Sequence, residues 1–242
     1  MITLKIKKTP PNLGDMIDMV LLCHMISKVK EERVNLQCAF NDKIDYFKNL
    51  IDLGDVVINS DLVSDQTISY EPGLKGFPYY TTISKQVDNI QTKNKVKQFE
   101  LNLPNKFITT QWDAKQLYRN VNRWDNNRTS NIEKFYRNLG YDIMDIGGGK
   151  FSIEETAYIL SKASMHIGSD SGMAHFAKII MPIQNIHVYV NVRRRDNDNR
   201  FPDGWNVSSM ARELFRRGVM MNYCENPSNE QVEYFKDTKV YV

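Results

Sequence analysis

The sequence predicts an α/β protein made of two doubly wound halves in tandem. Strand-like and helix-like runs alternate from residue 1 to residue 60, and the alternation restarts near residue 106. Between them, residues 61–105 form a polar and aromatic segment with weak periodicity. Alternating strands and helices are typical of parallel sheets, which bind ligands at the carboxyl ends of their strands.

The first half is expected to be a βαβαβ unit. The expected strands cover residues 1–9, 33–40 and 54–60, and the expected helices cover 16–32 and 41–53. In the first helix, Met16, Met19, Val20 and Cys23 recur near helical spacing. The stretch 70–82 carries two prolines, two glycines and three tyrosines, so we expect an aromatic loop there. We place the domain boundary after residue 104, which gives domains 1–104 and 105–242.

The second half repeats the alternation. The expected strands cover residues 106–112, 141–149, 164–170 and 185–192, and the expected helices cover 128–140, 151–163, 171–180 and 208–218. Ser152 and Glu155 form an S-x-x-E capping box, and Gly140 is suited to the end of the helix before it. The final stretch, 228–242, is expected to be a short helix and a tail.

Composition excludes several classes of protein. No run approaches the roughly 20 apolar residues of a membrane span, and "MITLKIKKTPP" lacks the apolar region of a signal peptide. The three cysteines, Cys23, Cys38 and Cys224, are scattered, so we expect neither a zinc site nor a disulfide framework. A cytoplasmic location follows as the expectation. The net charge of +3 neither requires nor excludes a nucleic-acid partner.

Gly14 and Asp15 follow the first strand and begin the first helix. A glycine lets the backbone approach a ligand closely. Asp15 has two interpretations. It complements the dipole of the helix as a first-turn acid, or it is a general base that takes a proton from an acceptor hydroxyl.

Thr109 and Thr110 end the strand at 106–112, and Lys115 follows shortly after. Two hydroxyls and an ammonium suit phosphate oxygens. The alternative is a β-branched strand end followed by a solvated lysine.

The stretch "GSDSG" places Ser169, Asp170, Ser171 and Gly172 between a strand and a helix. Backbone N–H groups at such a junction favour an anion. Asp170, being acidic, would cap the helix or accept from hydroxyls instead. His175 lies one turn further on the same helix face and is either a support for this helix or simply a packed histidine.

Taken in order, these motifs resemble the family 9 glycosyltransferases, the heptosyltransferase-like group. The similarity lies in the early Gly-Asp, in the Thr-Thr strand end with a lysine beyond it, and in D-[ST]-G-x-x-H-x-A over residues 170–177. It is good over 106–190, thinner over 1–60, and absent from 61–105 and after 192. The chain is also short for this family, which reduces its N-terminal, acceptor-side domain.

The resemblance implies a compact GT-B fold, two Rossmann-like domains with a cleft between them. It implies an inverting, metal-independent enzyme that needs no cofactor and moves a sugar from a nucleotide-diphosphate sugar to an acceptor hydroxyl. Asp15 would be the general base. The implied donor-binding residues are Gly14, Thr109, Thr110, Lys115, Ser169, Asp170, Ser171, Gly172 and His175.

Four arginines, Arg193, Arg194, Arg195 and Arg200, follow the strand at 185–192. They form a solvated loop balanced by nearby aspartates, or they clamp a polyanion such as a DNA backbone. The acceptor is therefore a saccharide or a hydroxymethylated base in phage-type DNA.

The sequence leaves two rival functions open. One is a non-catalytic module that binds a nucleotide or a nucleotide sugar, and the other is a different Rossmann-type enzyme. Against a dinucleotide oxidoreductase, no G-x-G-x-x-G follows the first strand. The oligomeric state is left open.

Overall fold

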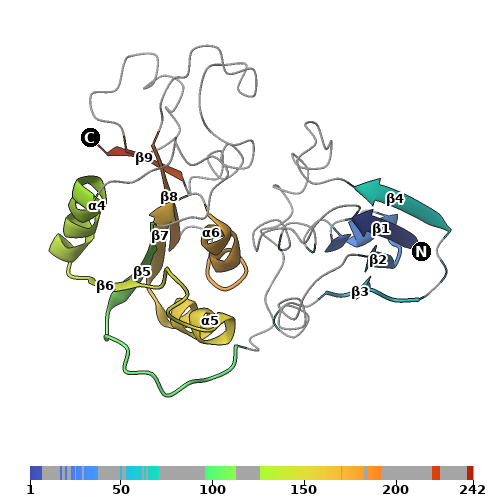
Figure 1. Ribbon diagram of the computed structural model, residues 1–242, viewed down its shortest axis with the longest axis horizontal. Coiled ribbons are helices and arrows are strands. Elements are labelled where there is room, and N and C mark those ends of the chain that lie inside the picture. The colour runs from blue at the N-terminus through green and yellow to red at the C-terminus, as the bar shows by residue number, and fades with distance from the viewer. Residues whose placement is uncertain are drawn as a thin grey trace, which may run out of the picture. The chain divides into compact units, whose positions relative to one another are not determined.

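The computed structural model of the chain divides into two compact units, Met1–Val96 (unit 1) and Lys97–Val242 (unit 2). The structure describes residues 1–6, 17, 20, 23–24, 26–28, 30–37, 50, 53–61, 63, 65–70, 96–112, 126–169, 171–182, 185–191, 220–223 and 239–241. Each unit contains one sheet in which every pair of strands is parallel (Figure 1). The predicted α/β class with parallel sheets is confirmed, while the boundary after residue 104 and the cleft between domains stay predictions.

Unit 1 contains a four-stranded sheet in the order β3-β2-β1-β4. Its strands are β1 (Ile2–Ile6), β2 (Val34–Gln37), β3 (Val56–Ile58) and β4 (Gln66–Tyr70). Ile2 of the central strand β1 lies opposite Val34 of β2 on one side and Gln66 of β4 on the other. The strand order therefore reverses between β1 and β4, the arrangement of the first half of a doubly wound sheet.

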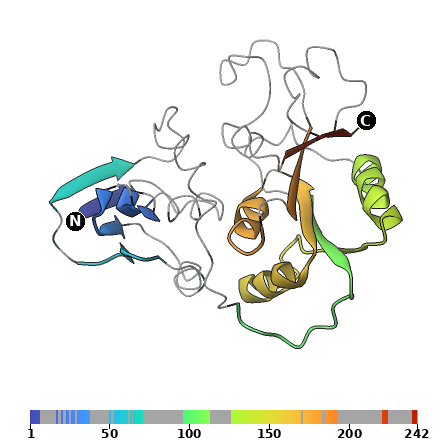
Figure 2. The ribbon, with the colours of Figure 1, turned by 180° about the vertical axis from the view of Figure 1, so that it is seen from behind.

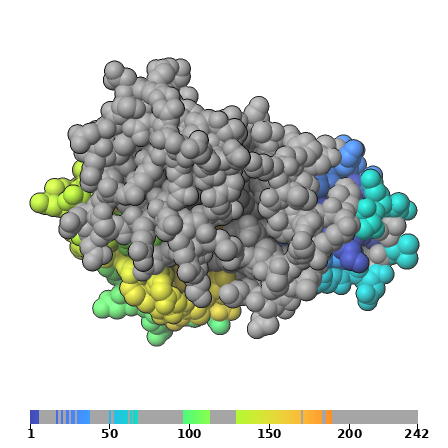
Figure 3. All heavy atoms as spheres, turned by 45° about the horizontal axis from the view of Figure 1, so that its top comes forward, coloured from blue at the N-terminus to red at the C-terminus, as the bar shows by residue number. Residues whose placement is uncertain are grey.

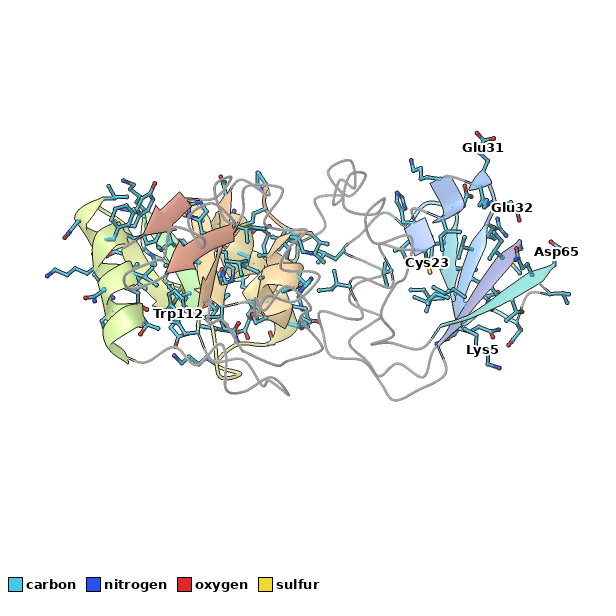
Figure 4. All side chains as sticks on the ribbon, turned by 90° about the horizontal axis from the view of Figure 1, so that it is seen from above. Lys5, Cys23, Glu31, Glu32, Asp65 and Trp112 are labelled. Carbon is cyan, nitrogen blue, oxygen red and sulfur yellow. The ribbon has the colours of Figure 1, made fainter. Side chains whose placement is uncertain are left out.

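The helix that follows β1 along the chain carries buried apolar residues. The described residues between 17 and 30 are helical. Every third position of this helix is buried, namely Ile17, Val20, Cys23 and Ile26 (Cys23 is labelled in Figure 4). This spacing gives the apolar stripe of an amphipathic helix. Leu4 of β1 and Leu36 of β2 are also buried, with no exposed surface.

Unit 2 contains a six-stranded sheet in the order β10-β9-β8-β7-β5-β6. Its strands are β5 (Phe107–Gln111), β6 (Asp142–Asp145), β7 (Met165–Ser169), β8 (Ile186–Asn191), β9 (Met220–Tyr223) and β10 (Lys239–Tyr241). After β5, the chain first adds β6 on one side and then β7 on the other. The topological switch of this sheet is therefore the β5–β7 pair, where open α/β sheets bind ligands.

Helices lie on both faces of the unit 2 sheet. Figures 1 and 2 show α4 (Asn126–Asn138) on one side and α5 (Ile153–Lys162) and α6 (Gly172–Ala177) on the other. The α4 side is sealed by a core cluster of Ile108, Ile132, Tyr136 and Ile167. Atoms of α4 and α5 also reach the outer surface of this unit (Figure 3).

Local signals place the ends of α4 and α5. Ser152 Oγ accepts from the backbone N–H of Glu155, and the Glu155 carboxylate accepts from the backbone N–H of Ser152, so the predicted capping box is present. These hydrogen bonds to Ser152 hold the pKa of Glu155 below its usual range. Gly140 ends α4 with a φ of 80°, a conformation that favours glycine. Lys106 Nζ donates to the Leu139 carbonyl at 3.2 Å and so satisfies the last turn.

Three strands were not expected from the sequence. β4 lies inside the segment 61–105, which had no predicted strand, and β9 and β10 lie in a region expected to hold helices and a tail. β4 pairs with β1 over five positions that are more than sixty residues away in the chain. The helices expected at 208–218 and after 228 lie outside the described residues.

Candidate functional site

The carboxyl ends of β5 and β7 form the candidate site. They are neighbouring parallel strands at the topological switch of unit 2, so their ends meet at one edge of the sheet. β5 ends with Thr109, Thr110 and Gln111, and β7 ends with Gly168 and Ser169. Successive side chains of a strand point to opposite faces, so this edge has two chemically different sides.

The α4 side of the edge carries two hydroxyls, from Thr110 and Ser169. Thr110 lies opposite Ile167 in the β5–β7 register, and Ser169 is two residues beyond Ile167. Both hydroxyls therefore share the face of Ile108 and Ile167, with Cα atoms on the order of 8 Å apart from strand spacing and rise. The Thr110 and Ser169 residues have no exposed surface.

Neither of these hydroxyl oxygens has a hydrogen-bond partner in the part of the chain that the structure describes. A buried hydroxyl without a partner costs about 1–3 kcal/mol. Such groups are uncommon in folded proteins and call for an explanation, such as a bound group. A ligand that reaches them would have to replace the atoms that cover them in this structure.

Aromatic residues frame the same side of the edge. Trp112 directly follows β5 and packs partly buried against the core cluster, and its Nε1 donates to Glu133 Oε1 of α4 at 2.9 Å (Trp112 is labelled in Figure 4). Tyr136 Oη lies 2.7 Å from His187 Nδ1 of β8. These contacts tie α4 to the sheet below the two hydroxyls.

On the opposite side, Thr109 is engaged with β7. Its Oγ1 donates to the Met165 carbonyl at 3.3 Å and lies 3.0 Å from His166 Nδ1. A threonine hydroxyl has one proton, so Nδ1–H of His166 is the donor in the second contact. This assigns the proton to Nδ1 and leaves Nε2 as an acceptor, which has no partner among the described residues.

Burial keeps His166 neutral. The side chain has no exposed surface, and this desolvation lowers its pKa to about 3. A charged imidazole would lose its hydration and would carry a second N–H, on Nε2, that has no partner among the described residues, and for that reason the neutral form is strongly favoured. Thr109 and His166 therefore form a packed polar pair, and the proton of the Thr109 hydroxyl is donated to the Met165 carbonyl.

Gln111 connects β5 to the start of α6. Its Oε1 accepts from Ser171 Oγ at 2.5 Å, so the Ser171 hydroxyl bonds to β5 and does not cap its own helix. The two strands approach very closely here. A Cβ added at Gly168 would lie 2.3 Å from the Gln111 carbonyl oxygen, so only glycine fits without a shift of the backbone.

Gly172 and His175 belong to α6, a helix of six residues. His175 is buried, and its backbone N–H donates to the Ser171 carbonyl at 3.4 Å. Both sequence interpretations of His175 stay predictions.

The glycine turn after β6 is satisfied by its own residues. Asp145 Oδ1 accepts from the Gly147 backbone N–H at 2.9 Å, and Asp145 Oδ2 forms an ion pair with Lys150. Helix α5, which follows, is closed by its capping box.

Several predicted site residues lie outside the described residues. They are Gly14, Asp15, Lys115, Asp170, Arg193, Arg194, Arg195 and Arg200. The structure brings Thr110, Gln111, Ser169 and Ser171 to one edge of the sheet. The sequence had not singled out Gln111, although its place between two candidate hydroxyls and Trp112 was a usable signal.

Two kinds of feature are absent from the described part of the chain. No group of three or more His, Cys, Asp or Glu side chains there could hold a metal ion. None of the helices described is long and apolar enough to cross a membrane.

Comparisons with known proteins return solved structures alone. No family model and no curated protein matches the chain. A bacterial iron-containing dodecameric glycosyltransferase, TibC from enterotoxigenic E. coli H10407, is similar with a TM-score of 0.49 and 15% identity over 74% of this chain. TibC described as a heptosyltransferase in complex with ADP-D-beta-D-heptose is similar with a TM-score of 0.48 and 12% identity over 73%. The matches cover 56% and 55% of those chains, so this chain spans little more than half their length.

Proposed function

We propose that unit 2 binds the diphosphate of a nucleotide sugar and that the protein is a glycosyltransferase. The observation that carries the proposal is the pair of buried hydroxyls, Thr110 and Ser169, at the carboxyl ends of the two switch-point strands. Hydroxyls in this place can donate to phosphate oxygens, and donation to a charged group is stronger than donation to a neutral one. The sequence motifs over 106–190 support the same chemistry.

In the proposed reaction, the bond between the sugar and the diphosphate breaks as the acceptor hydroxyl attacks. Negative charge grows on the leaving diphosphate, and groups that bind it more strongly at that moment accelerate the step. Thr110 and Ser169 would donate to it, with Lys115 as the proposed cation. Thr109 has a structural role in this proposal, because its hydroxyl already donates to Met165.

The first prediction compares stability with affinity. Thr110→Val and Ser169→Ala each remove a buried hydroxyl that has no partner, so each is expected to stabilise the ligand-free protein by about 1 kcal/mol. If the hydroxyls contact a diphosphate, the same changes weaken the binding of ADP-, GDP- or UDP-sugars by about tenfold or more. Thermal unfolding and calorimetric titration measure the two effects on the same samples.

A matched control is available on α5. The hydroxyl of Thr156 is also buried but donates to the Ser152 carbonyl at 2.8 Å. Thr156→Val should therefore lower stability by about 0.5–1.5 kcal/mol and leave affinity unchanged. The proposal fails if none of the nucleotide sugars binds, or if Thr110→Val raises stability with no loss of affinity.

The second prediction concerns the acceptor. If the acceptor is DNA, replacing Arg193, Arg194 and Arg195 by Ala removes three cations that neutralise phosphates. Duplex binding at low salt should then be lost, and the salt dependence of the native protein should be steep. Binding of the sugar donor should not change. A native protein that binds no duplex even at low salt would leave a saccharide as the proposed acceptor.

A further inference from the structure

Gln111 holds together three segments at the edge of the unit 2 sheet. It is the last residue of β5, and its backbone pairs with Gly168 of β7. Its Cγ lies 3.1 Å from the place where a Cβ of Gly147 would be, so it also lies against the glycine turn after β6. Its Oε1 accepts from Ser171, the residue before α6.

This arrangement fixes the position of the Gln111 side chain, whose amide is neutral. Close backbone contact with Gly168 holds its main chain, and Ser171 fixes the direction of its amide oxygen. A glutamate has nearly the same shape and would accept from Ser171 equally well. The chemical difference between the two residues at this place is one negative charge at the edge where Thr110 and Ser169 end their strands.

We infer that Gln111 is a positioning residue that fixes the start of α6 against β5, and that its neutral amide keeps this edge open to a polyanion. The inference rests on the proposed function and deepens it. The ligand class follows from the chemistry: a nucleoside diphosphate group, whose oxygens carry charge that a carboxylate at residue 111 would repel.

The test separates charge from structure with three variants and one control. Gln111→Glu keeps the acceptor for Ser171 and adds a charge, while Gln111→Leu and Ser171→Ala remove the hydrogen bond. Gln98→Glu makes the same chemical change at an exposed position of unit 2. The probes are ADP, GDP and UDP, together with the matching nucleosides, and the measurements are Kd by calorimetry and the melting temperature.

Gln111→Glu is expected to weaken diphosphate binding about tenfold, the effect of a like charge in a partly screened setting. Nucleoside binding and the melting temperature should stay close to those of the native protein, and Gln98→Glu should change neither. Gln111→Leu and Ser171→Ala should each weaken diphosphate binding, and the double variant should be no weaker than the worse single one, because both remove the same contact.

Each other outcome has a definite meaning. If the native protein binds diphosphates and Gln111→Glu binds them equally well, the inference about Gln111 fails and the proposed function stands. Equal loss of nucleoside and diphosphate binding, or a large fall in melting temperature for Gln111→Glu, would show a purely structural role and overturn the inference. If the native protein binds none of the diphosphates, the proposed function and this inference fail together.

Discussion

Lowering the pH from about 7 to about 4.5 is expected to destabilise unit 2 by about 2.5 kcal/mol through His166 alone. The cause is burial. In the folded protein the pKa of His166 is lowered to about 3, and in the unfolded chain it returns to its ordinary value of 6.5. At a pH between these two pKa values, His166 is protonated in the unfolded chain and neutral in the folded protein.

The direction of the effect follows from proton binding. Above pH 6.5 the imidazole is neutral in both states, so its contribution to stability is fully present. As the pH falls below 6.5, only the unfolded state gains a proton, and stability is lost until the pH approaches the folded pKa of about 3. The expected result is a steady decline of the unfolding free energy over that interval.

Tryptophan fluorescence can follow this decline in unit 2. All three tryptophans, Trp112, Trp124 and Trp205, lie in that half of the chain. The control is His166→Asn, whose amide can still donate toward Thr109 but does not titrate. Subtracting the pH dependence of its unfolding free energy from that of the native protein removes the contribution of the carboxylates, which both proteins share. Identical pH profiles for the two proteins would contradict the buried, neutral state of His166.

The parts of the fold that follow from local chemistry could be predicted from the sequence. The capping box of α5 needs Ser152 and Glu155 at a spacing of three, and Gly140 suits the end of α4 by its own backbone freedom. β5 and β7 each lie inside a strand expected from the sequence, at 106–112 and 164–170. Each signal lies within a few residues of the structure that it predicts.

The parts that depend on distant segments could not be predicted in this way. β4 is a five-residue strand with little apolar character, and pairing with β1 is what defines it. Within the site, Thr109 and Thr110 look equivalent in the sequence. Because successive side chains of a strand point to opposite faces, only Thr109 faces His166. The Thr109 hydroxyl contacts Nδ1 of this histidine, which lies 57 residues away in the chain. The link from Gln111 to Ser171 spans 60 residues and has no local signature.

In the proposed transferase, Asp15→Asn is expected to lower turnover by roughly 10²–10⁴-fold, the usual contribution of a positioned general base. Asparagine keeps the shape of the side chain but cannot take the proton of the acceptor hydroxyl. The affinity for the donor should barely change, because the proposed donor contacts other than Gly14 belong to unit 2. Stability should change by no more than about 0.3–1 kcal/mol, since asparagine retains capping ability.

The measurement combines three quantities on one protein: the rate at which nucleoside diphosphate is released in the presence of an acceptor, the Kd of the donor, and the melting temperature. Asp18→Asn, three residues along the same predicted helix, is the matched control and should leave turnover unchanged. Near-normal turnover of Asp15→Asn with a lower melting temperature would make Asp15 a helix-start residue and place the base elsewhere. A native protein that binds donors tightly but transfers sugar to neither saccharides nor hydroxymethylated DNA would favour the non-catalytic binding module, because binding of the donor needs no general base whereas transfer needs one beside the acceptor.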